Sequence, residues 1–265
     1  MTLFFILARW STCAIPLGIF AMLASAADNL DRFEAGIAGD AKEGQLPYRL
    51  LKPKNYDAGK KYPLVLFFHG AGERGNDNRK QLIHGMKEFA SDAMMDKYPC
   101  FVLAPQCPEG QQWVDAPWSA DAHQMAKEPT KAFRQSLALV EALQKQFSID
   151  STRVYVTGLS MGGFGAWEAV QRRPDLFAAA IPICGGGDPA YAKNVAQTAV
   201  WAFHGADDDA VKPSRTEAMI AAVTPLSKRV KVTIYANTGH DSWSKTYSDP
   251  KVLDWLFAQK KVGAN

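Results

Sequence analysis

Residues 153–170, RVYVTGLSMGGFGAWEAV, constrain the fold of this chain more than any other segment. A β-branched run ends in a cluster of glycines around one serine, and the residues that follow have helical spacing. The string GLSMG, residues 158–162, matches Gly-x-Ser-x-Gly, in which a sharp turn between a strand and a helix exposes a nucleophilic serine. A plain glycine-rich turn is the alternative. The context of the pattern therefore predicts an exposed nucleophile, Ser160.

The rest of the chain alternates between strand-like and helix-like segments, which predicts a mostly parallel sheet covered by helices on both faces. In such a sheet, functional groups gather beyond the carboxyl ends of the strands. The expected strands are 46–53, 60–70, 100–106, 153–158, 177–184, 199–205 and 230–236. The expected helices are 79–90, 130–147 (with Thr130 as N-cap), 160–173, 213–223 and 250–260.

The N-terminus differs in composition from the rest of the chain. Residues 1–23 carry a single charge, Arg9, and the small-residue string ASA comes before the first cluster of charged residues. This pattern predicts a secretory signal, residues 1–26, cleaved after Ala26, with an uncleaved membrane anchor as the alternative. The α/β catalytic domain is then expected over 27–265, secreted or periplasmic, with no stable membrane association.

Composition and cysteine content limit the function classes. The 265 residues are 47% hydrophobic, which suits one sizeable domain, and the formal charge of +3 is scattered, so no nucleic-acid partner is expected. The predicted mature chain keeps Cys100, Cys107 and Cys184. Cys100 and Cys107 bracket an extended strand of roughly 23 Å, too long for a disulfide, whereas a Cys107–Cys184 bridge stays open. The histidines and cysteines lack zinc-ligand spacing, so no metal and no cofactor are expected.

A nucleophilic serine requires a base and an orienting carboxylate. His240 lies in the loop after the last expected strand, from which it can reach over the serine. His69 and His204 each end a strand, and a structural or supporting role is expected for both. The acid is expected among three consecutive aspartates, residues 207–209, after the strand that ends near His204.

Acyl transfer also needs two backbone N–H groups that stabilise the oxyanion. The residue after the nucleophile, Met161, is expected to supply one of them. The loop that follows an earlier strand, FFHGAGERGNDN, is expected to supply the other. Ala71 is the predicted donor in that loop, and Gly72 is the alternative.

Six strings carry a resemblance to the α/β-hydrolase superfamily and, within it, to secreted esterases grouped with dienelactone hydrolases, feruloyl esterases and polyhydroxybutyrate depolymerases, some of them named predicted peptidases. The strings are LPYRLLKPKNYDAGKKYPLVLFFHGAGERGNDN, FVLAPQCPEGQQWVD, VYVTGLSMGGFGAWE, IPICGGGDP, FHGADDDAV and TGHDSW. Family members often show His-Gly-x-x-Asp, which implies that Asp208 is the acid and leaves Asp207 as the runner-up. The string here continues Ala-Val-Lys and departs from the family's Val-Pro ending.

The resemblance implies cleavage of carboxylic esters through an acyl-serine intermediate, with Ser160, Asp208 and His240 as the catalytic residues. Small-molecule or polysaccharide-linked esters are the expected substrates, feruloyl and acetyl esters of plant polysaccharide among them. Trp113, Trp118 and Trp243 are predicted to contact substrate, because aromatic rings beside a cleft suit an aromatic acyl group or a sugar face. A serine peptidase of related fold and a non-catalytic binding module are the alternatives. The sequence does not define the oligomeric state.

Overall fold

The computed structural model describes residues 29–39 and 44–261, which form one eight-stranded sheet in the order β1-β2-β4-β3-β5-β6-β7-β8. The predicted signal segment lies outside the described residues. From β4 to β8 in this order, all neighbouring strands are parallel. The pairs β1–β2 and β2–β4 are antiparallel. The strands are β1 (Phe33–Ala38), β2 (Leu46–Leu51), β3 (Tyr62–Phe68), β4 (Phe101–Pro105), β5 (Ile149–Leu159), β6 (Ala179–Ile183), β7 (Ala199–Gly205) and β8 (Val230–Tyr235).

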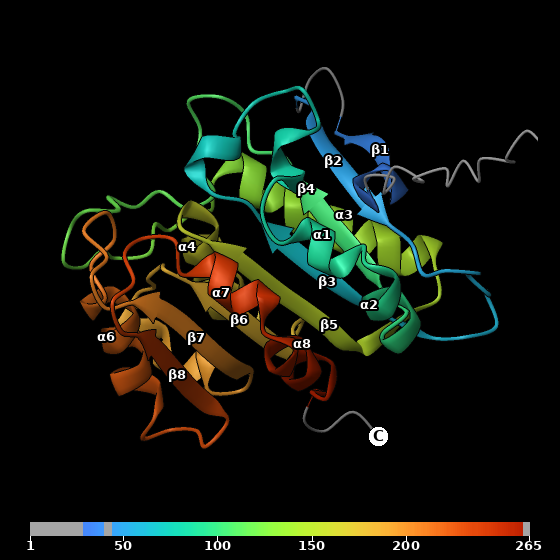
Figure 1. Ribbon diagram of the computed structural model, residues 1–265. Helices are drawn as coiled ribbons and strands as arrows, with labels where there is room; N and C mark the ends of the chain where they lie inside the picture. The colour runs from blue at the N-terminus through green and yellow to red at the C-terminus, as the bar shows by residue number, and fades with distance from the viewer. Residues whose placement is uncertain (1–28, 40–43, 262–265) are drawn as a thin grey trace, which may run out of the picture.

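Helices cover both faces of this sheet (Figure 1). One layer holds α3 (Lys131–Gln146), α4 (Met161–Arg172), α5 (Ala192–Val195) and α6 (Ser214–Val223). The other layer holds α1 (Met86–Phe89), α2 (Asp92–Lys97), α7 (Trp243–Ser248) and α8 (Pro250–Phe257). Short 3-10 turns lie at Asn29–Arg32, Ala71–Glu73, Lys80–Leu82 and Pro189–Tyr191.

The sheet separates two hydrophobic cores because side chains alternate between the faces of each strand. On β3, Leu64, Leu66 and Phe68 pack into the core beneath α3 and α4, whereas Val65 and Phe67 pack into the core beneath α1, α2 and α8. All five side chains are fully buried. Burial on both faces explains the continuous apolar run of this segment and confirms the predicted fold class.

The predicted elements agree with the structure in most places. The side chain of Thr130 accepts a hydrogen bond from the N–H of Phe133 and caps α3 as predicted. The single helix expected over 79–90 is wrong: Gly85 has a φ of 75° and separates a 3-10 turn from α1. The pattern also did not predict β1, the short helices α2 and α5, or α7. Within the described residues, no helix combines the length and apolarity needed to span a bilayer.

Candidate active site

Ser160 lies between the end of β5 and the first residue of α4. Its backbone has a φ of 53° and a ψ of −119°, a conformation that is strained for any residue with a side chain. The N–H groups of Gly163 and Phe164 donate to the Ser160 carbonyl, so helical hydrogen bonding begins at the serine itself. This abrupt change from strand to helix is the geometry that the Gly-x-Ser-x-Gly pattern predicted.

Two glycines make the crossing of β5 and α4 sterically possible. A Cβ on Gly158 would lie 2.3 Å from the carbonyl oxygen of Gly162. A Cβ on Gly162 would lie 2.0 Å from the carbonyl oxygen of Phe68, at the end of β3. Both clashes are with backbone, which cannot rotate away as a flexible side chain can. The glycines therefore allow the strand, the helix and β3 to meet directly beneath Ser160.

A continuous hydrogen-bonded chain joins Ser160 to two other side chains. The Nε2 of His240 lies 2.8 Å from the Oγ of Ser160, and its Nδ1 lies 2.8 Å from an Oδ2 oxygen of Asp208. Asp208 is buried, whereas Asp207 and Asp209 are exposed. The structure thus brings together the three side chains that the sequence predicted, although 80 residues separate the serine from the histidine.

Asp208 is held as a carboxylate by an unusually complete set of donors. Its Oδ1 accepts hydrogen bonds from the N–H groups of Ala210 (3.0 Å) and Val211 (2.9 Å). Burial by itself would raise the pKa of Asp208, but hydrogen bonds from His204, His240 and the Val211 N–H lower it overall, well below the usual range. A carboxylate with so low a pKa can orient His240 without taking a proton from it.

His204 is part of this site, and its supporting contact was not specified from the sequence. Its Nε2 lies 3.1 Å from Oδ2 of Asp208, the same oxygen that contacts His240, and 2.8 Å from the carbonyl of Val211. Its Nδ1 lies 2.8 Å from the Oγ1 of Thr216. A signal was present in the sequence, because a histidine at the end of a strand and an aspartate four residues later fall on one tight turn.

The predicted oxyanion donors lie at the same edge of the sheet. Met161 is the first residue of α4, and Ala71 is the first residue of a 3-10 turn after β3, so neither N–H has an acceptor within its own helix. The two segments are in contact, because a Cβ on Gly70 would lie 2.8 Å from the Cδ1 of Leu159, next to the serine. Gly72, the alternative donor, is exposed and has open space around its Cα.

The prediction that Trp113 contacts substrate is wrong. Its side chain is completely buried in the core beneath α3 and α4. Its indole N–H donates to the carbonyl of His69 at 3.0 Å, and its ring packs against that of Phe68. Trp113 is buried because the segment after β4 packs on α4, where Trp113 lies against Gly165 and next to the end of β3.

The other two predicted tryptophans are partly exposed. Trp243 packs edge-on against the imidazole of His240, with ring centroids 5.3 Å apart and an interplanar angle of 87°. The guanidinium carbon of Arg74 lies 5.9 Å from the centroid of the Trp118 ring. Arg74 belongs to the loop that holds Ala71, the predicted oxyanion donor. Trp243 therefore lies beside the candidate base, and a substrate contact for both residues stays a prediction.

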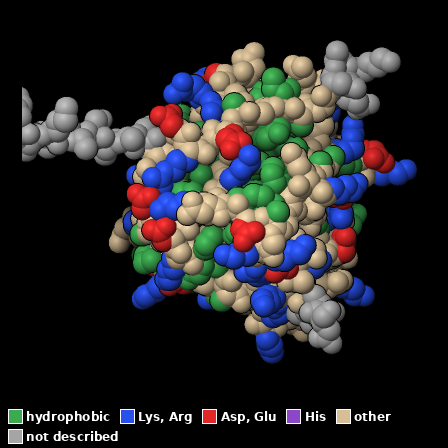
Figure 2. Space-filling view, turned by 90° about the vertical axis from the view of Figure 1, so that its right-hand side faces the viewer, with side chains coloured by type: hydrophobic (Ala, Val, Ile, Leu, Met, Phe, Trp, Pro, Cys, Tyr) green, Lys and Arg blue, Asp and Glu red, His purple; other side chains and the backbone are tan. Residues whose placement is uncertain are grey.

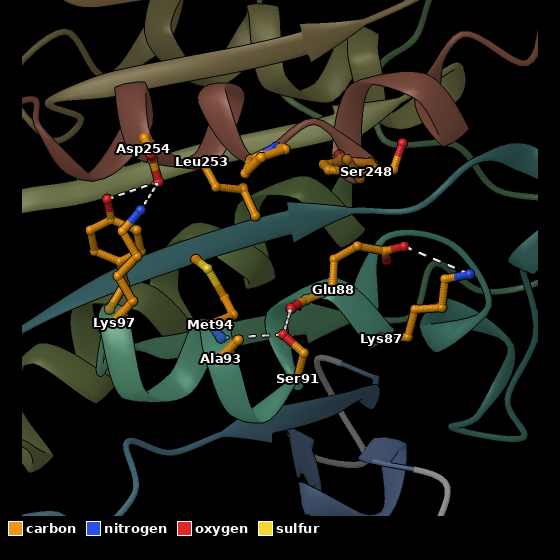
Figure 3. Close-up of a pocket in the computed structure, with 12 residues that line it drawn as sticks. Lys87, Glu88, Ser91, Ala93, Met94, Lys97, Ser248, Leu253 and Asp254 are labelled. Atoms are coloured by element: carbon orange, nitrogen blue, oxygen red, sulfur yellow. Dashed lines mark hydrogen bonds and ion pairs between the residues drawn. The ribbon is translucent and has the colours of Figure 1, made fainter. Parts of the chain in front are cut away.

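A separate pocket of about 370 Å³ lies between α1 and α2 on one side and α7 and α8 on the other (Figure 3). Its lining is mostly apolar and includes Met94 and Leu253, and an ion pair between Lys97 and Asp254 of 2.7 Å crosses one end. The lining contains none of the three hydrogen-bonded side chains at Ser160. This pocket is therefore not the candidate active site.

Surface charge and cysteine state bear on the remaining predictions. On the face in Figure 2, basic and acidic side chains are interspersed without a field of one sign. In the described part of the chain, Cys100, Cys107 and Cys184 are all free and buried. Cys107 and Cys184 therefore form no disulfide with each other.

Comparisons with known proteins agree with this fold. The Esterase family model matches residues 41–260. A thermostable esterase of known structure is 36% identical, with a TM-score of 0.81 over 88% of this chain and 64% of its own. A bifunctional acetylxylan esterase/xylanase from Neocallimastix patriciarum is 27% identical over 60% of this chain. Poly(3-hydroxyalkanoate) depolymerase C from Paucimonas lemoignei is 48% identical over 18% of it.

All three of these proteins are longer than the matched region. The chain spans 21% of the acetylxylan esterase/xylanase and 12% of the depolymerase. The match to the family model nevertheless extends over most of the chain and includes the serine, the aspartate and the histidine described above. The chain belongs to the Esterase family and has the α/β-hydrolase fold.

Proposed function

We propose that this protein hydrolyses carboxylic esters through an acyl-serine intermediate. The observation that carries the proposal is the hydrogen-bonded chain from Ser160 through His240 to Asp208, at a strained turn between a strand and a helix. His240 accepts the serine proton as Ser160 attacks the ester carbonyl, and then donates that proton to the leaving alcohol. Water repeats the sequence at the acyl-enzyme and releases the acid.

The negative charge that develops on the carbonyl oxygen is stabilised by the N–H groups of Met161 and Ala71. Their position at the starts of two helical turns supports this role, because such N–H groups are unsatisfied and point away from the helix. Asp208 keeps the Nδ1 hydrogen of His240 in place and stabilises the imidazolium that forms during attack.

The proposed substrates are small or medium esters, including acetyl or feruloyl esters attached to plant polysaccharide. The similarity to a protein named as an acetylxylan esterase supports the acetyl ester. The ring of Trp243 against His240, together with Trp118 near the loop of Ala71, supports an aromatic or sugar group beside the reacting ester. We propose that residues 1–26 direct the chain to the periplasm or the medium and that residues 27–265 act there.

The test is to compare the purified protein with its Ser160→Ala variant on one panel of substrates. The panel contains p-nitrophenyl acetate, butyrate and octanoate, methyl ferulate, acetylated xylan and a peptide anilide. The wild type is expected to cleave esters, and the variant is expected to lose at least about 10³-fold in kcat because the nucleophile is gone. The ranking of the esters then names the substrate class.

Three outcomes contradict the proposal. Cleavage of the anilide without cleavage of any ester indicates the peptidase alternative. No turnover of any substrate by protein with the circular dichroism spectrum of a folded α/β domain indicates a binding module. Equal ester turnover by the wild type and the Ser160→Ala variant contradicts the acyl-serine mechanism itself.

A further inference from the structure

One buried thiol lies directly behind the nucleophile. Cys184 follows β6, is fully buried and has a φ of 40°, a conformation that is costly for a residue other than glycine. Its Sγ accepts a hydrogen bond from the N–H of Ser160 at 3.3 Å. Ester hydrolysis through Ser160 and His240 uses no thiol, so that reaction does not explain the position of Cys184.

Cys184, Asp208 and His240 form a group of three donors with different chemistry. The Sγ, a carboxylate oxygen and a ring nitrogen all lie within 4.8 Å of one another. Sulfur, nitrogen and oxygen donors together suit a borderline or soft divalent ion such as Zn²⁺ or Cd²⁺. In a tetrahedral zinc site, ligand distances of about 2.0–2.3 Å put donor atoms roughly 3.3–3.8 Å apart. Nδ1 of His240 and Oδ2 of Asp208 lie 2.8 Å apart, so they must separate by roughly 0.5 Å to hold one ion.

Ser242 provides a second, independent observation at the same place. Its hydroxyl is fully buried, and the Oγ has no hydrogen-bond partner of ordinary geometry. It lies within hydrogen-bonding range of the Cys184 thiol. The Ser242 oxygen therefore lies beside the three donors. A fourth oxygen is therefore available to an ion held at this position.

We propose that Cys184, Asp208 and His240 form an inhibitory site for a zinc-like divalent ion, which switches off the esterase. The inference rests on the proposed hydrolytic role of His240. The ion forms bonds to the Cys184 sulfur, to a carboxylate oxygen of Asp208 and to the Nδ1 of His240. The thiol proton leaves to solvent. Before the ion binds, Nδ1 of His240 carries a hydrogen that it donates to Asp208. The ion takes the place of this hydrogen, and His240 stays neutral as the tautomer with its hydrogen on Nε2.

Inhibition follows from the change of tautomer. In the uninhibited state, Nε2 lies 2.8 Å from the Oγ of Ser160 and has a free lone pair for the serine proton. With the ion on Nδ1, Nε2 already carries a hydrogen. His240 then cannot act as base.

The charge balance of the site favours a divalent ion. Cys184 is fully buried, so a lone thiolate there would be desolvated and costly. One thiolate and one carboxylate exactly offset two positive charges, so the occupied site has no net buried charge.

The test uses Cd²⁺, whose bond to a thiolate absorbs in the ultraviolet. Wild-type protein in chelator-free buffer is expected to bind one Cd²⁺ with this absorption, to lose p-nitrophenyl acetate hydrolysis in parallel, and to recover it with EDTA. In the Cys184→Ser variant, the Cd²⁺ concentration for half inhibition, relative to its own metal-free rate, is expected to rise at least about tenfold. Cys100→Ser removes a buried thiol elsewhere and is expected to behave as wild type.

The Ser160→Ala variant separates this inference from the proposed function. It lacks the nucleophile but keeps every proposed ligand, so it is expected to show the same Cd–thiolate absorption, and Ser160→Ala combined with His240→Ala is expected to weaken it. If neither the wild type nor any variant hydrolyses the ester, but the Cd–thiolate absorption is present, the hydrolytic proposal is contradicted and the metal site is supported. Equal inhibition of wild type and Cys184→Ser, or no Cd–thiolate absorption in Ser160→Ala, would overturn the metal site.

Discussion

At the scale of single residues, two buried histidines near the active site have opposite hydrogen positions. The Nε2 of His69 accepts the N–H of Cys107 at 2.9 Å, and its Nδ1 lies 2.6 Å from the carbonyl of Gly70, so Nδ1 carries the hydrogen. The Nε2 of His204 faces two acceptors, the carbonyl of Val211 and the carboxylate of Asp208, and must carry a hydrogen. Neighbouring groups thus decide how each histidine supports the site.

His69 makes the stability of the protein depend on pH. Burial lowers its pKa to about 4, from 6.5 in an exposed histidine. As the pH falls, His69 therefore takes up a proton in the unfolded chain before it does so in the folded protein. The contribution of neutral His69 to the free energy of unfolding is present above about pH 6.5 and is lost toward pH 4. At about 1.36 kcal/mol per pH unit, the loss approaches roughly 3 kcal/mol. Urea unfolding from pH 7.5 to 4.5 measures it.

A matched pair of variants isolates this effect. His69→Gln keeps an acceptor for the N–H of Cys107 but has no ionisation, so its free energy of unfolding is expected to fall less steeply with acid. His84→Gln changes a partly exposed histidine and is expected to keep the wild-type dependence. If His69→Gln follows the wild-type curve, protonation of His69 does not cause the loss.

At the scale of elements, the site depends on where three segments meet. The end of β3, the end of β5 and the start of α4 are in backbone contact through Gly158 and Gly162. The end of β6 adds its Ile183 carbonyl, which accepts the N–H of Ser160 at 3.0 Å. Because these contacts involve backbone, the serine is positioned by strand register and helix packing and only weakly by its own side chain.

Gly162→Ala tests this arrangement. The new Cβ would lie 2.0 Å from the carbonyl oxygen of Phe68 and 2.7 Å from that of His69, so α4 must move away from β3. We expect the free energy of unfolding to fall by about 1–3 kcal/mol or more and ester hydrolysis to fall with it. Gly72→Ala, with nothing within 4 Å of its Cβ, is expected to change stability by less than about 0.5 kcal/mol. Similar denaturation curves for both variants would contradict the packing argument.

At the scale of the whole molecule, one sheet with a core on each face positions every group of the site at one edge. The proposed nucleophile follows β5, the proposed acid follows β7 and the proposed base follows β8, and these strands lie in one parallel array (Figure 1). The carboxyl ends of parallel strands share an edge. Groups far apart in sequence therefore meet at this edge.

The proposed export of the chain is also a property of the whole molecule. In a host with a secretory pathway, the protein is expected in the periplasm or the medium, with Ala27 as its first residue, because ASA ends a short apolar segment. Fractionation and N-terminal sequencing measure both. An exported or membrane-bound protein that keeps residues 1–26 would favour the anchor alternative.

The sequence alone determined the local features of this protein. Strand and helix periods, the Thr130 cap and the turn around Ser160 are encoded within a few adjacent residues, so composition and spacing reveal them. His240 followed because a base was required after the last strand. The helix expected over 79–90 failed because Gly85 adopts a left-handed conformation against the ring of Tyr247, a contact 162 residues away in the chain.

Only the tertiary structure decided the rest. It put Asp208 rather than its neighbours under His240, buried Trp113, and brought Cys184 next to Ser160 and Asp208. Spacing of histidines and cysteines along the chain gave no sign of that last group. Such contacts join residues that are distant in sequence, and they depend on loop closure, burial and strand register, which no periodic pattern records.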